Sequence, residues 1–233
     1  MVSETKGLKI ESGLAAKEDI EKILQLVARI YRESGYFKTD SVPVSWKSTL
    51  FSENTSIFVV KVNGVIVGTV SVIHDTGNIP MDLAFHDELE ILRSKGKISE
   101  VGKLAIDKEL LKSLIDENGG KSKEHELFQR ISITLFGLVY LEGLMKGSRY
   151  LCIAVLEKHS SFYETALLFE KIGEPRGYST SPDIPATIER PMALDYSKRS
   201  EILAKNGGRI NMFYDAMARM VPELKSKFRT NTD

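Results

Sequence analysis

A chain of 233 residues that is 42% hydrophobic and 27% charged is long enough to bury one sizeable core. Lysine and arginine together number 32, and so do aspartate and glutamate, which excludes an overall charge that would attract the chain to nucleic acid or to an anionic membrane. The sequence holds one cysteine, no signal-peptide pattern and no run of about 20 apolar residues, so we expect a soluble cytoplasmic protein without disulfides or a transmembrane segment.

The N-terminal part of the chain predicts a helix, a β-hairpin and an insertion. Residues 8–12 are a strand candidate, and residues 16–32 place apolar side chains three and four positions apart, as on one face of a helix. In SIFVVKVNGVIVGTVSVIHD, two β-rich runs flank Asn63-Gly64, which is the strongest short hairpin signal. The stretch at about 77–97 begins with turn residues and continues as a short amphipathic helix, so we interpret it as an insertion between strands.

The rest of the chain alternates strands with helices. We expect a strand in ISEVGKLAID at 98–107 and, after a polar loop, a helix from about 123 to 146 that ends at Gly147. Ser161 and Glu164 have the spacing of a capping box, which predicts the start of the next helix. The remaining expected elements are a buried strand at 149–157, a strand at about 186–194 and a mostly helical tail from 197 to about 228.

This order of elements predicts an α+β fold, in which a mixed sheet is flanked by helices around one core. We expect one domain at residues 1–196, which includes the insertion, and a C-terminal, mostly helical extension at 197–233. No internal repeat or low-complexity segment divides the sequence further.

Two charged residues lie inside the apolar strand ISEVGKLAID. An unpaired buried charge costs several kcal/mol, so such residues pair, reach water or do chemistry. Glu100 and Lys103 point in opposite directions if the strand is regular, whereas a β-bulge at Gly102 would turn both to one side. The bulge would also open a cleft in which unpaired backbone groups bind an extended ligand. A purely structural pair at the end of the strand is an equal alternative.

This strand, the insertion before it and a later helix together resemble a known family. SEVGKLAID, a helix after a glycine-bearing loop, a buried strand and FYETALLFEKIGE resemble the Gcn5-related N-acyltransferases. More narrowly, LPxDxxF…ELxxLRxxGxxxEVxKLAID resembles the bacterial N-acyl amino acid synthases, relatives of the acyl-homoserine-lactone synthases, with coverage from about 57 to 194. The matching residues are Ile79 (in place of leucine), Pro80, Asp82, Phe85, Glu88, Leu89, Leu92, Arg93, Gly96, Glu100, Val101, Lys103, Leu104, Ala105, Ile106 and Asp107.

The resemblance implies a mixed, mostly antiparallel sheet with a bulged and splayed middle strand, and transfer of an acyl group from a thioester to an amine. The attacking ammonium must lose a proton, and the leaving thiolate benefits from gaining one. Glu100 is the candidate base. Lys103 stands where the relatives carry arginine, and it either keeps Glu100 ionised or binds the acceptor carboxylate. Tyr163 is the candidate acid, with a packed structural tyrosine as the alternative and His159 as a competing acid.

The sequence of the expected donor-binding region differs from that of the acetyl-CoA-dependent relatives. It lacks the Q/R-x-x-G-x-G/A motif whose backbone binds pyrophosphate. ENGGKSKEH stands in its place, and a nucleotide P-loop is excluded because Ile115 occupies its first glycine position. A loop of this kind suits the phosphopantetheine arm of an acyl carrier protein better than free coenzyme A. The expected donor-binding residues are Leu104, Ala105, Ile106, Gly119, Gly120, Lys121 and Ser122.

The resulting hypothesis is an N-acyltransferase that moves a long-chain acyl group from an acyl carrier protein to an amino acid or a related small amine. Coenzyme A as donor, and a non-catalytic module that binds an acylated ligand, are the alternatives. We expect no metal and no tightly bound cofactor, because the histidines show no ligand spacing. Lysines at 95, 97, 121 and 123 either form a basic patch for the acidic carrier or are simply solvated.

Overall fold

The computed structural model describes residues 2–5, 8–35, 44–50, 52–117, 124–179, 185–198 and 208–223. The nine strands in these ranges form one sheet in the order β1-β2-β3-β4-β5-β6-β9-β7, and β8 pairs with β9. All pairs are antiparallel except β5 with β6, so the predicted mixed, mostly antiparallel α+β sheet is confirmed. The strands are β1 (Val2–Thr5), β2 (Leu8–Leu14), β3 (Thr55–Val62), β4 (Val65–His74), β5 (Ile98–Ile106), β6 (Tyr150–Leu156), β7 (Glu170–Lys171), β8 (Arg176–Tyr178) and β9 (Thr187–Asp195).

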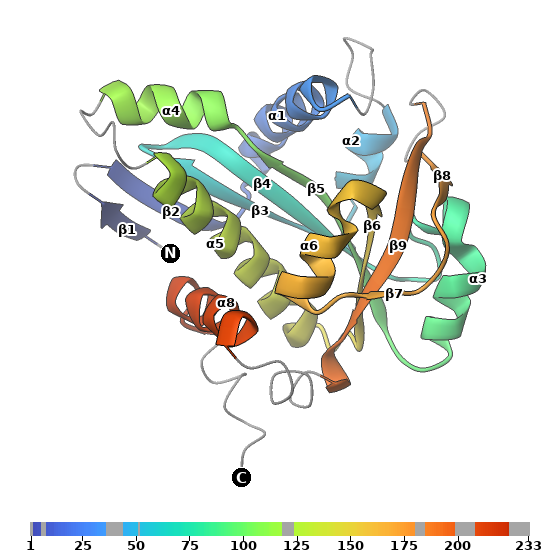
Figure 1. Cartoon of the computed structure of the whole chain (residues 1–233). Helices are drawn as coiled ribbons and strands as arrows, with labels where there is room; N and C mark the ends of the chain where they lie inside the picture. Colours follow the sequence, from blue (N-terminus) through green and yellow to red (C-terminus); the bar gives the residue numbers. More distant parts are fainter. Residues whose placement is uncertain are drawn as a thin grey trace.

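Helices cover both faces of the sheet (Figure 1). α5 packs on β3, β4 and β5 and also contacts α8, whereas α1 packs on β4 and β5 from the other side. The helices are α1 (Ile20–Glu33), α2 (Val44–Leu50), α3 (Asp82–Arg93), α4 (Lys108–Glu117), α5 (Glu124–Met145), α6 (Glu157–Leu167) and α8 (Gly208–Met220). Of the described helices α5 alone is long and apolar enough to cross a membrane, but its packing against the sheet accounts for its apolar composition.

Several elements lie where their sequence signals predict them. The hairpin between β3 and β4 turns at Asn63 and Gly64, which have φ values of 50° and 79°. Two successive left-handed residues define the tight turn that favours Asn-Gly. α5 ends just before Gly147, whose φ of 70° is a conformation that glycine adopts without strain.

Two expectations about helices are wrong. α6 begins at Glu157, directly after β6, so Ser161 and Glu164 lie inside the helix and form no capping box at its start. α4 occupies residues that we expected to form a polar loop after β5. Asp107 starts this helix: its buried carboxylate accepts a hydrogen bond from the Leu110 N–H at 2.9 Å and pairs with Arg29.

The predicted insertion contains α3, which lies beside β8 at one end of the sheet (Figure 1). Its apolar face packs with Ile73 and Tyr150 in a separate hydrophobic cluster. Arg93 holds the two ends of the insertion together, because its guanidinium donates to Asp75 at 2.7 Å and to Asp82 at 2.6 Å. Asp82 in turn accepts the Ile79 N–H at 2.8 Å, so this network shapes the turn that precedes α3.

The hydrogen bonds of the Arg93 guanidinium group predict a measurable loss of stability when this group is replaced by an ammonium. Arg93→Lys keeps the charge but has a single donor nitrogen, which cannot form the paired bonds that the guanidinium makes to both Asp75 and Asp82, so the free energy of unfolding falls by roughly 1.5–3 kcal/mol, as for a lost charged hydrogen bond. Urea denaturation measures this change. Arg149→Lys is the control: Arg149 is half exposed and lies 3.8 Å from Asp195, so its replacement costs less than about 0.5 kcal/mol. Equal losses in the two variants contradict the role of Arg93.

Candidate active site

The candidate site is built around a β-bulge in β5. Gly102 pairs with Ser71 and Ala105 pairs with Thr69, so two residues of β5, Lys103 and Leu104, lie opposite one residue of β4. Lys103 has a φ of 54°, which is rare for a residue with a side chain and stores strain of about 1–3 kcal/mol. A bulge is therefore present as predicted, but it consists of Lys103 and Leu104, and Gly102 still pairs with Ser71.

β5 and β6 separate after Glu100, just before the bulge. Only Ile98, Ser99 and Glu100 pair with β6, at Tyr150, Leu151 and Cys152, although both strands continue in the same direction. The backbone groups of β5 and β6 that face each other after Glu100 are left without a strand partner. The sheet thus holds an opening whose edge carries Glu100 and Lys103, as the predicted splayed strand requires.

Glu100 lines a small pocket of about 100 Å³ on one side of this opening. Its side chain is 4% exposed; Oε2 accepts the Met81 N–H at 2.9 Å and Oε1 accepts the Tyr178 hydroxyl at 3.4 Å. Burial raises the pKa of Glu100 to about 7, against the opposing effects of the Met81 N–H and the Lys103 charge. A carboxylate of this kind exchanges a proton close to neutral pH.

Two further ionisable residues line the same pocket. The Lys103 ammonium lies 4.3 Å from the centre of the Trp46 ring, and burial lowers its pKa to about 8 although Glu100 and Glu189 counteract the shift. Glu189 is 8% exposed, accepts the Thr187 hydroxyl at 2.6 Å, and has a pKa that burial raises to about 7. Three coupled groups therefore all titrate near neutrality, which is typical of functional sites.

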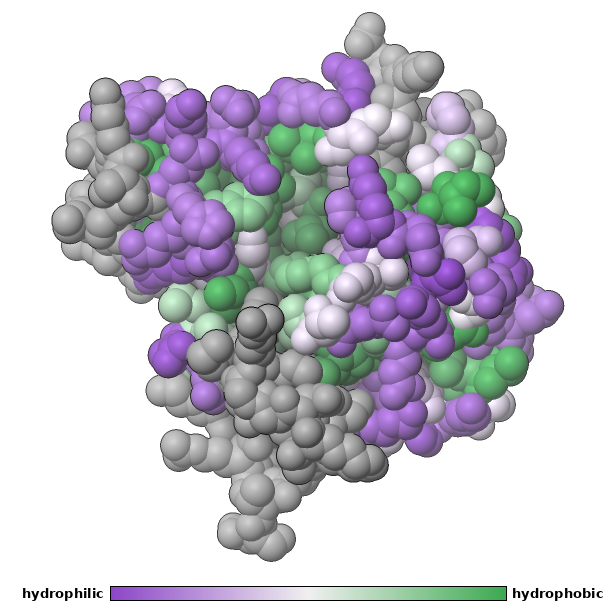
Figure 2. Space-filling model, in the orientation of Figure 1, coloured by the Kyte–Doolittle hydropathy of each residue, from purple (hydrophilic) through white to green (hydrophobic). Residues whose placement is uncertain are grey.

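A larger cavity of about 500 Å³ lies on the other side of Lys103. Its walls are mainly apolar, and its volume lies within the range of about 300–1,000 Å³ that is usual for ligand pockets. Figure 2 shows apolar side chains in a depression between α5 and α6, with hydrophilic side chains along both sides. The two pockets share Tyr31, Val101, Gly102, Lys103 and Ala154, so they meet at the bulge.

The structure brings together some of the expected site residues and separates others. Glu100 and Lys103 share the small pocket, whereas Tyr163 and His159 line the larger cavity, which Lys103 connects to it. Of the residues after the bulge, Leu104 lines the larger cavity, while Ala105 and Ile106 pack in the hydrophobic clusters and line neither pocket. Gly119, Gly120, Lys121 and Ser122 lie outside the described residues.

The sequence interpretation missed three residues of the small pocket: Trp46, Tyr178 and Glu189. The signal for Glu189 was present, because this charge interrupts the apolar strand ATIERPMALD much as Glu100 interrupts its own. Tyr178 follows a glycine in a short segment with no periodic pattern, so only its position next to β9 and its bond to Glu100 identify it. Among the described residues, no group of three or more His, Cys, Asp or Glu side chains is arranged to hold a metal ion.

Comparison with known families agrees with this geometry. The family model of the N-acyl amino acid synthase FeeM matches residues 22–116 and 122–190, which is more than half of the chain. The chain belongs to the N-acyl amino acid synthase family. Like the rest of this family it is an acyltransferase, and the matched residues include Glu100, Lys103 and Tyr163.

The solved structures of one N-acyl amino acid synthase and of an N-acetyltransferase share the fold. FeeM, an N-acyl amino acid synthase from uncultured soil microbes, is 24% identical and has a TM-score of 0.63 over 82% of this chain and 93% of its own. An N-acetyltransferase from Staphylococcus aureus Mu50 is 12% identical, with a TM-score of 0.52 over 80% and 97% of the two chains. The AHL synthase LasI is 13% identical, with a TM-score of 0.46 over 86% and 95%. No curated protein is similar enough to match the chain.

The electrostatic coupling between Lys103 and Glu100 predicts how the pKa of Glu100 changes when Lys103 is replaced. Lys103→Met keeps the apolar stem over Trp46 but removes the charge that favours the ionised form of Glu100, so the pKa of Glu100 rises above its present value of about 7. Carbon NMR of glutamate-labelled protein follows this titration. Lys158→Met is the control, because Lys158 is exposed and lines only the larger cavity. An unchanged Glu100 titration in Lys103→Met contradicts the coupling.

Proposed function

We propose that the protein transfers a long-chain acyl group from the thioester of an acyl carrier protein to the amine of an amino acid or a related small amine. The observation that supports this proposal is the meeting of two unlike pockets at the bulge of β5. The larger, apolar cavity suits an acyl chain with its pantetheine arm, and the smaller, charged pocket suits a polar acceptor. The thioester carbonyl then lies at their junction, beside Gly102 and Lys103.

The ionisable groups fit the proton transfers of this reaction. The amine nitrogen bonds to the thioester carbonyl carbon and the C–S bond breaks, so the amine loses a proton and the thiolate gains one. Glu100 accepts the amine proton from within the small pocket. Tyr163, on the larger cavity's side of the junction, supplies the proton to the thiolate. Both roles are proposals that rest on the position of each side chain.

Lys103 and Glu189 orient the acceptor in this proposal. Among the described residues of the small pocket, Lys103 is the one cation, and it offers a partner to the carboxylate of an amino acid. Glu189, held by the Thr187 hydroxyl, offers a second carboxylate to the incoming ammonium. The pocket therefore recognises both charged groups of a zwitterion. A simple amine without a carboxylate would leave Lys103 paired only with the two glutamates.

The proposed base predicts a loss of activity without a loss of stability. Glu100→Gln lowers kcat by about 10²-fold or more, because an amide cannot accept the amine proton. In the wild-type protein, kcat/KM rises with pH through about 7 as Glu100 and Glu189 ionise, and the variant shows a smaller rise because only Glu189 still ionises there. Release of free thiol from an acyl thioester, recorded across a pH series, measures both effects. Wild-type kcat in the variant contradicts the assignment.

Thermal unfolding distinguishes a loss of activity in Glu100→Gln from misfolding of the variant. The folded-state pKa of Glu100 lies above its usual 4.5, so the stability gained by protonation is complete below pH 4.5 and is lost as the pH rises through about 7. Above that pH the buried charge opposes folding, and a neutral glutamine does not lower Tm. Glu142→Gln is the matched control, because this partly buried glutamate contacts His74 and lines neither pocket.

The donor is tested by offering both kinds of thioester with the same acyl chain. We expect kcat/KM to be at least about tenfold higher for acyl carrier protein than for coenzyme A, a difference of about 1.4 kcal/mol in transition-state binding. An equimolar mixture of the twenty amino acids serves as acceptor, and mass spectrometry identifies the amide. Equal or faster reaction with acyl coenzyme A assigns the donor to coenzyme A instead. Absence of any amide with either donor overturns the proposed function.

A further inference from the structure

α8 docks into the main hydrophobic core through one face. Tyr214, Met217 and Val221 are buried there, at spacings of three and four residues, against α5 and α6. The Tyr214 hydroxyl donates to the Leu167 carbonyl at 3.4 Å, and its ring meets that of Tyr140 edge to face at 5.3 Å. These contacts fix α8 over the end of α6 (Figure 1).

α8 lies outside the part of the chain that the family model matches. That match ends at residue 190, whereas α8 spans Gly208–Met220. Features of the reaction common to the family therefore need not involve this helix. Any property that α8 gives the protein is therefore not implied by the match to the family model.

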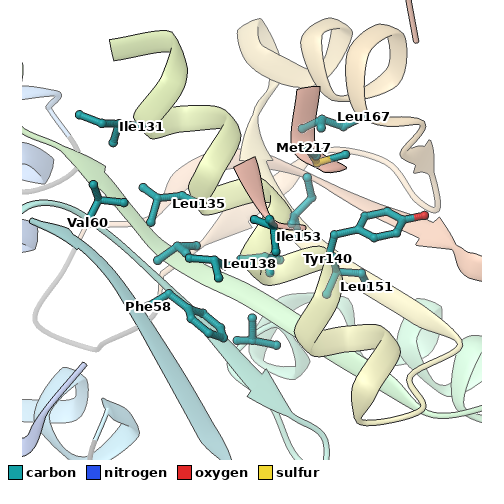
Figure 3. Packing of buried hydrophobic residues seen from close by; sticks show 14 of the residues in the cluster. Phe58, Val60, Ile131, Leu135, Leu138, Tyr140, Leu151, Ile153, Leu167 and Met217 are labelled. Carbon is teal, nitrogen blue, oxygen red and sulfur yellow. The ribbon is translucent and has the colours of Figure 1, made fainter. Parts of the chain in front are cut away.

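The larger cavity has an open side and a closed side. Ser34, Lys158 and His159, which line it, are exposed, so the cavity reaches solvent beside α1 and α6. At the other side its wall is fully buried: Leu151 is 2% exposed, Leu167 is 4% exposed and Met217 is 0% exposed. Figure 3 shows Met217 beside Leu167, with Ile153 and Tyr140 nearby. Among the described side chains of α8, Met217 is the one that lines the cavity.

We infer that α8 forms the end wall of the acyl cavity and that Met217 limits the length of the acyl chain that this protein accepts. The inference rests on the proposed function, because it assigns the larger cavity to the acyl chain. A close-packed wall excludes an acyl chain that is one methylene too long, because the extra group clashes with the wall. An acyl chain that is one methylene too short leaves a gap at the wall. Methionine suits such a wall because its unbranched side chain fills irregular spaces.

The other buried residues of the wall come from α5, β6 and α6, which belong to the matched region. Met217 of α8 is the wall residue that lies outside the matched region. A shorter or longer side chain at this one position therefore changes the depth of the cavity while the bulge, Glu100 and Lys103 keep their surroundings. Chain-length preference and chemical rate are separable for this reason.

The experiment compares acyl-chain preference in the full-length wild type and in Met217→Ala. Saturated acyl thioesters that differ by two methylenes compete in one reaction with a mixture of the twenty amino acids, and mass spectrometry gives the ratio of amide products. We expect Met217→Ala to raise the ratio of longer to shorter products by about tenfold or more, since each methylene in an apolar pocket changes kcat/KM by about 10–200-fold. Met217→Leu, which conserves volume, keeps the wild-type ratio.

Val221→Ala is the matched control for loosened packing, because Val221, directly after α8, is buried in the same core but does not line the larger cavity. It lowers Tm and leaves the product ratio unchanged. An unchanged ratio in Met217→Ala overturns the inference, and so does an equal shift in Val221→Ala, which assigns the effect to loosened docking of α8.

A binding measurement separates failure of this inference from failure of the proposed function. Saturated free fatty acids of increasing length are added to each variant, and the rise in Tm reports binding. The longest fatty acid that raises Tm is longer for Met217→Ala than for the wild type. If this limit shifts while no amide forms, the wall is confirmed and the proposed function fails. If amide forms and neither the limit nor the product ratio shifts, the wall is wrong and acyl transfer stands.

Discussion

The site depends on one extra residue in β5. Without the bulge, Lys103 would point to the opposite face from Glu100. The strained backbone of Lys103 places its ammonium over Trp46, beside two carboxylates. The separation of β5 from β6 after Glu100, just before the bulge, places the opening next to these charges. The strain is held by the hydrogen-bonded strand β4 on one side and by the packed clusters under α1 and α5.

Burial then gives these charges their chemical character. In water Glu100 and Lys103 would both be fully ionised at neutral pH, and neither would exchange protons readily. Desolvation moves the pKa of the glutamate up and that of the lysine down, so the two values approach each other. The Met81 N–H keeps Glu100 from becoming permanently protonated, and the Arg93 network fixes the turn that presents this N–H. The insertion thus contributes to the site although its own helix carries no proposed catalytic group.

The sequence contains local signals for much of this arrangement. Asn63-Gly64 predicts its turn because two left-handed residues are required there, and charges in an apolar strand identify Glu100 and Lys103. The start of α6 is not predicted, because the helix follows β6 without a capping side chain and the Ser161–Glu164 pattern arises by chance inside it. Tyr178 and Glu189 are 78 and 89 residues from Glu100, and only the order of the strands brings them to it. Long-range pairing of this kind leaves no periodic trace in the sequence.

The charges of the small pocket also bear on the order of events in the proposed reaction. With Glu100 and Glu189 ionised and Lys103 protonated, the pocket carries one excess negative charge in a poorly solvated space. The ammonium of a zwitterionic acceptor pairs with this excess carboxylate while its own carboxylate pairs with Lys103, so the amino group binds in its protonated form. Transfer of its proton to Glu100 leaves the total charge unchanged, replaces this ion pair by two neutral groups and frees the nitrogen lone pair for attack. The two glutamates therefore have different uses, one to attract the charged acceptor and one to make it reactive.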